Sequence, residues 1–470
     1  EVFVVKGSNL TNEYSVVRSD PNVQSLGDDT QDAVDTRALS ITLYVDTYTL
    51  VFSGTGAISD YDFSRGIYPS WYEERARIEK IVLGSGVTGI GKDAFRDLTK
   101  LTSVSIANTV TSIGATAFAN CTRLTAISIP NSVSSLNLSM FDGCTSLANI
   151  TIASDNSWLS SVNGVIYDKP KATVILCPVG KKGTYAISNG VTTIRSWAFD
   201  GCTGLTGITI PSSVKEIQAS AFNNCSGLLS FVIPAATTSI NISAFDGCSK
   251  LFAFSVASGN TEYASEDGVL FNKRKTTLIQ FPDGKKGNYT IPGSVTRIEN
   301  FAFDNALMPS VNIPQSVTEI GNYAFANCTS LLSLYVFWPN PGVVSYGNSI
   351  FSGLDATKKG KIKLYVPLSA DAVYRSSSIW RDFLTTPTNI EPVGNNPLRL
   401  YPSPARESVT VSGLQGGEVI SLFDLSGRQQ LSLKATDESE TIAINHLPTG
   451  IYIVRIANAN EVHTLKLVVK

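Results

Sequence analysis

The chain has 470 residues, of which 43% are hydrophobic and 16% charged, with 36 Gly and 20 Pro. This composition is typical of a β-rich, turn-rich protein rather than a helical one. The formal net charge of -2 excludes the basic field by which proteins attract nucleic acid. The chain has no run of 18 apolar residues, so no transmembrane segment is predicted, and we expect that the start at Glu1 follows removal of a signal peptide.

The first 86 residues carry no full copy of the repeat that follows them. Residues 1–38 are polar and are predicted to form an N-terminal segment that is partly flexible, with a loop at 27–32. Residues 39–86 are predicted to form an N-terminal cap, because the first coil of a stack needs one covered face. Within this cap, residues 78–83 alternate like a strand.

Residues 87–339 repeat every 23 residues on the pattern Val-x-x-Ile-x-x-x-Ala-Phe-x-x-Cys-x-x-Leu-x-x-Ile-x-Ile-Pro. Copies begin at Val87, Val110, Val133, Val191, Val214, Thr237, Val295 and Val317. A fixed period in this range indicates a solenoid, whose coils bury their apolar faces by stacking on one another. In each copy the segment equivalent to 124–129 alternates like a ladder strand, and the other side of the coil is predicted to be loosely wound.

Cysteine occupies one repeat position in six of the coils. These residues are Cys121, Cys144, Cys202, Cys225, Cys248 and Cys328. Such regularity predicts a packing ladder of reduced thiols, with disulfides between stacked coils as the alternative. Cys177 lies outside this position and is expected to fill apolar space. No His lies near these thiols, so neither a metal site nor any cofactor is predicted.

Two matched inserts interrupt the repeats, at about 153–190 and 257–294, with a constant offset of 104 residues. Residues 164–169 correspond to 268–273, and a Gly-Lys-Lys-Gly sequence recurs at 180 and 284. A three-coil unit has therefore been duplicated together with its insert. Each insert has the pattern of strand, polar turn, strand, Pro, Gly-Lys-Lys-Gly turn and strand, which predicts an extra coil or hairpin continuing the stack.

The inserts supply the candidate binding residues, since the outward positions of the ladder strands are almost all small and lack binding hot spots. The candidates are Trp158, Tyr167, Lys181, Lys182, Tyr263, Phe271, Lys285 and Lys286. Aromatic rings of this kind contact proteins and glycans, and paired lysines suit an acidic glycan. The alternative is that the rings cover hydrophobic edges and that the lysines lie in solvated turns.

After the last copy, residues 340–395 are predicted to form a C-terminal cap and a linker rich in Pro, Gly and Asn. Residues 396–470 show about seven short alternating strands separated by turns, which predicts a small immunoglobulin-like β-sandwich. The predicted fold is thus a β-rich solenoid with a 23-residue period, followed by this sandwich.

Two family resemblances rest on these motifs. The repeat units, such as 110–132, resemble BspA-type leucine-rich repeats of bacterial surface proteins, over about 350 residues. The tail resembles the C-terminal sorting domain of the type nine secretion system of Bacteroidetes, although Ser403 replaces the usual Asn. The motif residues of this resemblance are Tyr401, Pro402, Pro404, Asp424, Gly427, Arg428, Gly450 and Tyr452. Together the resemblances imply a protein of the cell surface or outer membrane whose residues 396–470 engage the secretion machinery.

Both His residues, His446 and His463, follow residue 395, which excludes a Ser-His-Asp or Cys-His site in the solenoid. We therefore predict a non-enzymatic, exported binding protein. The repeats are expected to mediate adhesion to host matrix proteins, other microbes or glycans. The alternative hypothesis is a surface glycan-capture protein or a glycoside hydrolase that uses carboxylates alone.

Overall fold

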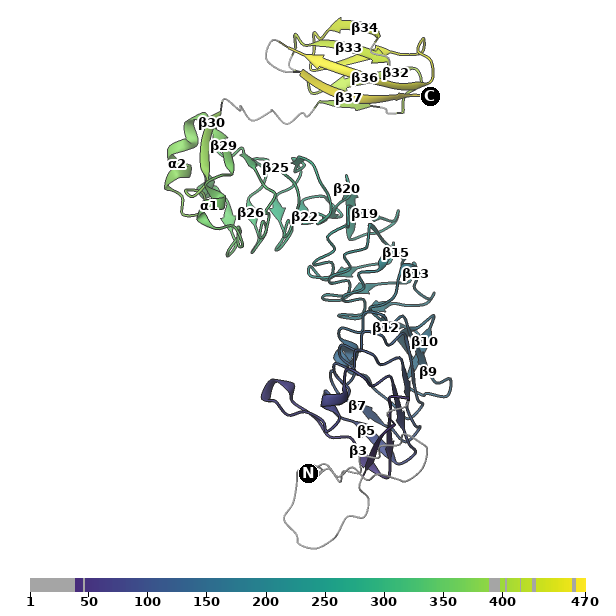
Figure 1. The fold of residues 1–470 in the computed structure, drawn as a ribbon. Coiled ribbons are helices and arrows are strands. Elements are labelled where there is room, and N and C mark those ends of the chain that lie inside the picture. Colours follow the sequence, from purple (N-terminus) through teal and green to yellow (C-terminus); the bar gives the residue numbers. More distant parts are fainter. Residues whose placement is uncertain are drawn as a thin grey trace. The chain divides into compact units, whose positions relative to one another are not determined.

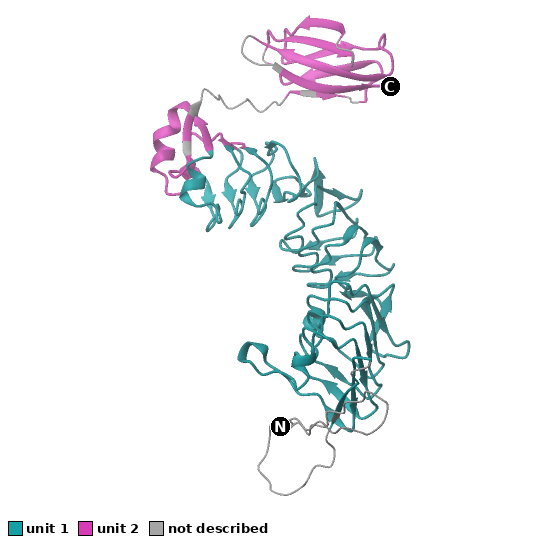
Figure 2. Cartoon of the chain, viewed as in Figure 1, with its two compact units in different colours: residues 1–311, 316–333, 344–362 teal, residues 312–315, 334–343, 363–470 magenta. Residues whose placement is uncertain are grey.

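The structure, a computed structural model, describes residues 39–44, 47–388, 398–401, 404–414, 416–424, 428–458 and 462–470. The predicted segment 1–38 and the linker residues 389–397 lie outside the described residues. The chain divides into two compact units (Figure 2). Residues 1–311, 316–333 and 344–362 belong to the first, and residues 312–315, 334–343 and 363–470 to the second.

One strand of each coil follows the apolar alternation of the repeat (Figure 1). These ladder strands are β4 (Lys80–Leu83), β6 (Ser103–Ser105), β8 (Ala126–Ile129), β9 (Asn149–Ile152), β13 (Gly183–Ala186), β15 (Leu205–Thr209), β17 (Ser230–Ile233), β19 (Ala253–Val256), β23 (Tyr289–Thr290), β25 (Ser310–Ile313) and β27 (Ser333–Val336). Parallel pairing in register places Ile127 beside Ile150 and Phe231 beside Phe254. Residues 23 positions apart therefore occupy equivalent places in neighbouring coils, as predicted for a solenoid.

The opposite side of the coil is more regular than the sequence pattern indicates, because nearly every coil except the one at Val133 contributes a second short strand there. These strands are β5 (Val87–Ile90), β7 (Ser112–Ile113), β14 (Thr193–Ile194), β16 (Glu216–Ile217), β18 (Ser239–Ile240), β24 (Arg297–Ile298), β26 (Glu319–Ile320) and β28 (Ser345–Tyr346). Most are only two residues long, which is too short for alternation to reveal them. Tight turns follow, except in the coil at Val133, where a 3-10 helix spans Leu138–Phe141.

The core of the solenoid is a column of stacked Phe rings beside the column of cysteines. Phe199, Phe222 and Phe245 stack with ring centroids 4.9 and 5.5 Å apart. All seven cysteines are free and buried, and most thiols donate to a main-chain carbonyl in the preceding coil, as Cys225 does to Phe199 at 3.1 Å. The six cysteines at the repeat position therefore form a packing ladder, and the structure has no disulfide among them. Cys177 is fully buried, and Cys202 donates to its carbonyl oxygen.

Before the first coil, β1 (Ser40–Tyr44) pairs antiparallel with β2 (Thr49–Ser53), and β2 pairs in parallel with β4. Short elements follow at β3 (Gly56–Ala57), η1 (Phe63–Arg65) and η2 (Tyr72–Glu74). Buried Trp71 lies edge-on to Phe52, with ring centroids 5.1 Å apart, and donates from Nε1 to the Ala94 carbonyl oxygen at 3.2 Å. These rings cover the first Phe of the stack, Phe95.

The segment after the repeats holds η4 (Pro341–Val343), α1 (Ala356–Lys359), β29 (Lys363–Pro367), η5 (Leu368–Ala370), α2 (Asp371–Ser376) and β30 (Leu384–Thr388). In the second unit β29 and β30 pair in parallel. The fully buried rings of Trp338 and Trp380 lie 6.3 Å apart, and the Tyr374 hydroxyl donates to the Trp338 carbonyl oxygen at 3.0 Å. These rings form the apolar core of the segment.

The C-terminal residues form two antiparallel sheets that confirm the predicted sandwich (Figure 1). Their strands are β31 (Arg399–Tyr401), β32 (Ser408–Ser412), β33 (Val419–Asp424), β34 (Gln429–Lys434), β35 (Ser439–Ala443), β36 (Gly450–Ala457) and β37 (Val462–Val469). The sheet orders are β31-β32-β35 and β34-β33-β36-β37. Val409, Ile442, Leu422 and Val454 belong to the core that both sheets share.

Candidate functional site

Each insert is a hairpin followed by an extra coil. Strands β10 (Leu159–Val162), β11 (Val165–Asp168) and β12 (Thr173–Leu176) form an antiparallel meander, and β20 (Tyr263–Glu266), β21 (Val269–Asn272) and β22 (Thr277–Gln280) repeat it. The connecting turns are Asn163-Gly164 and Asp267-Gly268, and all four residues have positive φ. Asn-Gly and Asp-Gly are the dipeptides that a two-residue hairpin turn favours. Strands β12 and β22 then pair in parallel with β14 and β24, which resumes the solenoid.

A buried asparagine anchors the start of each hairpin. Asn156 donates from Nδ2 to the carbonyl oxygens of Pro130 and Val133, and its Oδ1 accepts from the N–H groups of Trp158 and Leu159. Asn260 makes the corresponding four bonds. Neither residue is among the predicted site residues, although both occur at the offset of the duplication and an alignment of the two inserts pairs them.

In each Gly-Lys-Lys-Gly turn, the first Gly and the first Lys contact neighbouring parts of the chain, whereas the second Lys faces solvent. A Cβ at Gly180 would lie 2.5 Å from the Ser146 carbonyl carbon, so the turn approaches the preceding coil too closely for a side chain. Lys181 donates from Nζ to the carbonyl oxygens of Ala148 and Asn163. Its counterpart Lys285 pairs with the Asp267 carboxylate at 3.1 Å.

The second lysine of each turn, Lys182 or Lys286, is exposed to solvent. Of the aromatic candidates, Trp158 is 63% exposed, whereas Tyr167 and Phe271 are fully buried. The Tyr167 hydroxyl lies 2.6 Å from that of Tyr185 inside the coil. The candidate rings of Tyr167 and Phe271 therefore belong to the core.

Tyr263 is half-buried, and its hydroxyl accepts from the Ile240 N–H at 2.9 Å, which links the hairpin to β18. The exposed candidates on the two inserts are therefore Trp158, Lys182 and Lys286. Sequence spacing alone could not separate these from the buried members of the set.

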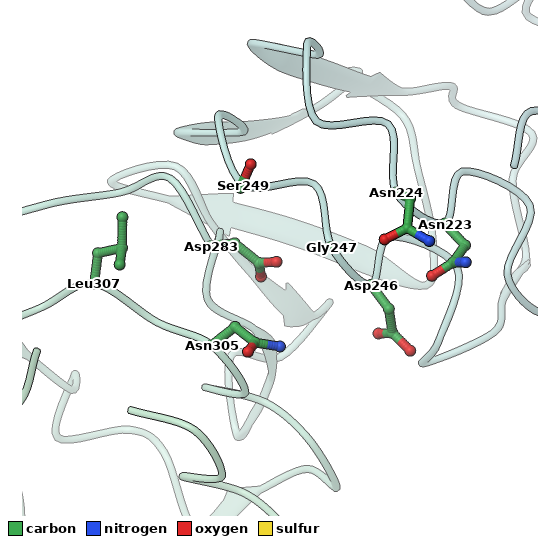
Figure 3. A pocket seen from close by; sticks show the side chains of 8 residues that line it. All are labelled: Asn223, Asn224, Asp246, Gly247, Ser249, Asp283, Asn305 and Leu307. Atoms are coloured by element: carbon green, nitrogen blue, oxygen red, sulfur yellow. The ribbon is translucent and has the colours of Figure 1, made fainter. Parts of the chain in front are cut away.

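A pocket of about 430 Å³ opens beside the second insert (Figure 3). Its lining includes Asp246, Asp283, Asn223, Asn224 and Asn305. Burial, together with the nearby carboxylates Asp304 and Asp246, raises the pKa of Asp283 to about 7. Burial likewise raises the pKa of Asp246 to about 6. Repeat spacing does not bring these two carboxylates together, because Asp246 comes from a repeat and Asp283 from an insert.

In the C-terminal domain, the predicted motif residues lie at strand ends and turns. Tyr401 ends β31 and is exposed, while Gly450 and Tyr452 begin β36. The Asp424 carboxylate accepts from the Arg428 N–H at 3.0 Å, closing the turn between β33 and β34.

The Tyr452 ring is buried, and its hydroxyl donates to the Pro448 carbonyl oxygen at 2.8 Å. Pro404 is exposed, whereas Pro402 and Gly427 lie outside the described residues. The motif thus shapes the turns of the sandwich.

The stacked parallel coils define a leucine-rich-repeat solenoid. Residues 65–163, 183–287 and 280–396 match the BspA type leucine rich repeat region, and these matches cover more than half of the chain. The protein therefore belongs to this family. Residues 399–470 match the secretion system C-terminal sorting domain, which identifies an exported protein of the cell surface or outer membrane. Both predicted resemblances are confirmed. No helix among the described residues is long and apolar enough to cross a membrane.

Solved structures with a similar fold include a leucine rich cell surface protein from Faecalibacterium prausnitzii, with 21% identity, coverage of 77% of this chain and 100% of that chain, and a TM-score of 0.40. A leucine-rich repeat protein from Bacteroides ovatus has 20% identity, coverage of 72% and 71%, and a TM-score of 0.34. The pneumococcal vaccine antigen PcpA has 17% identity, coverage of 67% and 68%, and a TM-score of 0.34. No curated protein matches the sequence.

Proposed function

We propose that the chain is a non-enzymatic adhesion protein that binds host matrix proteins, other microbes or glycans through its repeat solenoid. The observation that carries this proposal is the difference between the inserts and the repeats. The outward ladder positions are mostly small, such as Ser128 and Thr151, whereas the inserts add exposed Trp158, Lys182 and Lys286. An exposed indole and exposed ammonium groups supply the apolar and charged contacts that flat ladder faces lack.

The test is binding of the full chain to immobilised fibronectin, laminin and collagen, to whole bacteria and to an acidic polysaccharide such as heparin. We expect at least one of these surfaces to retain the protein. Combined substitution Trp158→Ala and Lys182→Ala should weaken that binding about tenfold, while Lys100→Ala, which removes an exposed lysine from an ordinary turn, should not. Absence of binding to every surface would refute the proposal.

The C-terminal domain is proposed to act as the secretion and anchoring signal through contacts with the export machinery. The match of residues 399–470 to a sorting domain supports this role. Deleting residues 396–470 in a cell that has this secretion system should leave the protein in the periplasm. Surface display at the normal level after the deletion would contradict the role.

A second candidate function, glycan capture with hydrolysis, is favoured by the pocket at Asp246 and Asp283. A carboxylic acid with a pKa of about 7 can protonate a leaving group at neutral pH, and a second carboxylate can act as base or nucleophile. The full chain would then release nitrophenol from a panel of nitrophenyl glycosides, and either Asp246→Asn or Asp283→Asn would abolish the release. No turnover of any glycoside by the unmodified protein would eliminate this candidate.

A further inference from the structure

Exposed aromatic rings occupy a backbone position that disfavours them. In most coils the residue five positions before the Cys position has positive φ, as in Asp93, Thr116, Ser220 and Ser349. In the coil that follows each insert this position holds a large ring, Trp197 at φ 64° and Phe301 at φ 58°. Bulky residues rarely adopt the left-handed region, which costs a residue with a Cβ about 1–2 kcal/mol relative to the right-handed helical region. The positive φ is a feature of the coil backbone. An aromatic residue at this position does not stabilise that conformation.

These rings face solvent rather than the core. Trp197 is 48% exposed and Phe301 is 39% exposed, and the two are related by the 104-residue offset of the duplication. We call the two copies of the duplicated unit the first and second block. In the second block Tyr323, at φ 56°, extends the exposed aromatic surface, because its ring stacks on Phe301 with centroids 5.1 Å apart and an interplanar angle of 7°. Residues in disfavoured backbone conformations cluster at binding sites.

A polar groove begins at the residue that precedes Trp197 in the first block. It measures about 450 Å³ and is lined by Ser196, Glu216, Ile217, Gln218, Ala219, Ser239, Ile240, Asn241 and Ile242. Trp197 follows Ser196 in the chain, and its N–H donates to the carbonyl oxygen of Ala219 at 3.3 Å. The groove thus runs across β16 and β18 from Ser196, the residue before the exposed indole.

In the second block, side-chain amides lie next to the exposed rings in the sequence, as Gln218 and Asn241 line the groove of the first block. Asn300 Oδ1 accepts from the Asn322 N–H at 2.7 Å, and Asn322 Oδ1 accepts from the Asn348 N–H at 2.6 Å. Asn300 and Asn322 directly precede Phe301 and Tyr323, so each ring has a side-chain amide next to it in the sequence. Hydroxyl and amide groups both donate and accept hydrogen bonds.

We propose that Trp197 with its groove, and Phe301 with Tyr323, form two binding sites, related by the duplication, for a neutral polysaccharide. A hexopyranose ring has an apolar C–H face that packs on an aromatic ring and hydroxyl groups that pair with amides and hydroxyls. The polar lining of the groove suits sugar hydroxyls better than the apolar anchors of a protein partner. This inference rests on the proposed binding function and names one ligand class for it.

The substitutions Trp197→Gly and Phe301→Gly separate binding from stability, because glycine adopts positive φ without strain. The full chain should be retarded in native gels that contain yeast mannan, barley β-glucan or dextran. The double glycine variant should lose this retardation, with at least a tenfold lower association constant, while its melting temperature stays equal or rises. Tyr68→Ala, which removes an exposed ring from the cap, is the control and should keep the retardation.

A second measurement needs no loss of a ring. Trp71, Trp338 and Trp380 are buried, so in a Trp158→Phe background the exposed indole is Trp197. The polysaccharide that retards the protein should shift the fluorescence emission of this variant to shorter wavelength, because it covers the indole.

Three results would overturn the proposal. They are no retardation by any of the three polysaccharides, no emission shift, and retardation that persists in the double glycine variant. Loss of matrix-protein binding in that variant, with polysaccharide binding unchanged, would instead assign the rings to a protein partner. Matrix-protein binding by a protein that no polysaccharide retards would leave the proposed adhesion function standing.

Discussion

The side-chain amide of Asn156 donates a hydrogen bond of 2.8 Å to the main-chain carbonyl oxygen of Val133, the residue that begins the preceding coil. The same side chain accepts from two N–H groups of the hairpin that follows it. One buried residue therefore satisfies polar groups of two coils and fixes the point where the insert leaves the repeat.

Replacing Asn156 with Ala is expected to lower the free energy of unfolding by about 3 kcal/mol, because it leaves several buried main-chain groups without partners. Urea unfolding followed by circular dichroism would measure the change. Asn131→Ala is the control, since its side chain bonds Asp155 at the surface, and its effect should stay within about 0.5 kcal/mol. Equal effects of the two substitutions would contradict the anchoring role.

The close approach of the Gly-Lys-Lys-Gly turn to the preceding coil gives a second prediction. A Cβ at Gly180 would meet the Ser146 carbonyl carbon at 2.5 Å and the Leu147 oxygen at 2.6 Å, both of them main-chain atoms that cannot move alone. We expect Gly180→Ala to destabilise the protein by about 2 kcal/mol. Gly293→Ala meets no atom within 4 Å and should be neutral or slightly stabilising. Thermal unfolding of the two variants tests the difference, and a neutral Gly180→Ala would refute the packing argument.

The repeat pattern predicted the solenoid because stacking maps sequence period directly onto space. Residues 23 positions apart, such as Ile127 and Ile150, are neighbours in register, so apolar and cysteine columns follow from counting. The duplicated inserts were equally visible. What spacing could not decide was which insert residues face solvent, because Tyr167 and Trp158 both occur in a strand and turn pattern and only packing separates them.

The pocket and the exposed rings escaped prediction for a different reason. Asp246 and Asp283 are 37 positions apart, which is not a multiple of the repeat, since Asp283 comes from the coil that the insert adds. The positive φ at Trp197 is a property of the coil backbone. A Trp in the sequence does not indicate this conformation, because Gly, Asn and Asp are the residues that usually adopt it. Aligning this position across the coils would have shown the aromatic substitutions.

The buried thiols are expected to be unreactive in the folded protein. Desolvation raises the pKa of Cys121 and Cys225 well above the usual value, and a hydrogen bond with Cys177 together with desolvation does the same for Cys202. Only the thiolate reacts readily. At pH 8 a thiol reagent such as dithionitrobenzoate should label fewer than one cysteine per native molecule and all seven after denaturation in urea. Rapid labelling of several cysteines in the native protein would show that the ladder is open to solvent.

Stability should fall as pH rises from about 4 to about 7, in part through the pocket. The folded-state pKa of Asp283 is about 7 and that of Asp246 about 6, both raised chiefly by burial above the usual 3.8 of an aspartate. In this window the folded protein holds protons that the unfolded chain has released, so each increase in pH favours unfolding. Both groups therefore contribute most to stability when protonated.

Asp283→Asn removes the larger of these two ionisations. At pH 7.5 the variant should be more stable than the unmodified protein by on the order of 3 kcal/mol, and at pH 4 the two should be nearly equal. Melting temperatures measured from pH 4 to pH 8 test this, with Asp267→Asn as the control because that carboxylate is largely exposed and pairs with Lys285 at the surface. The amide differs from the carboxylate chiefly in charge. If the gain in stability of Asp283→Asn over the unmodified protein does not grow with pH, ionisation of Asp283 costs no free energy in the folded state.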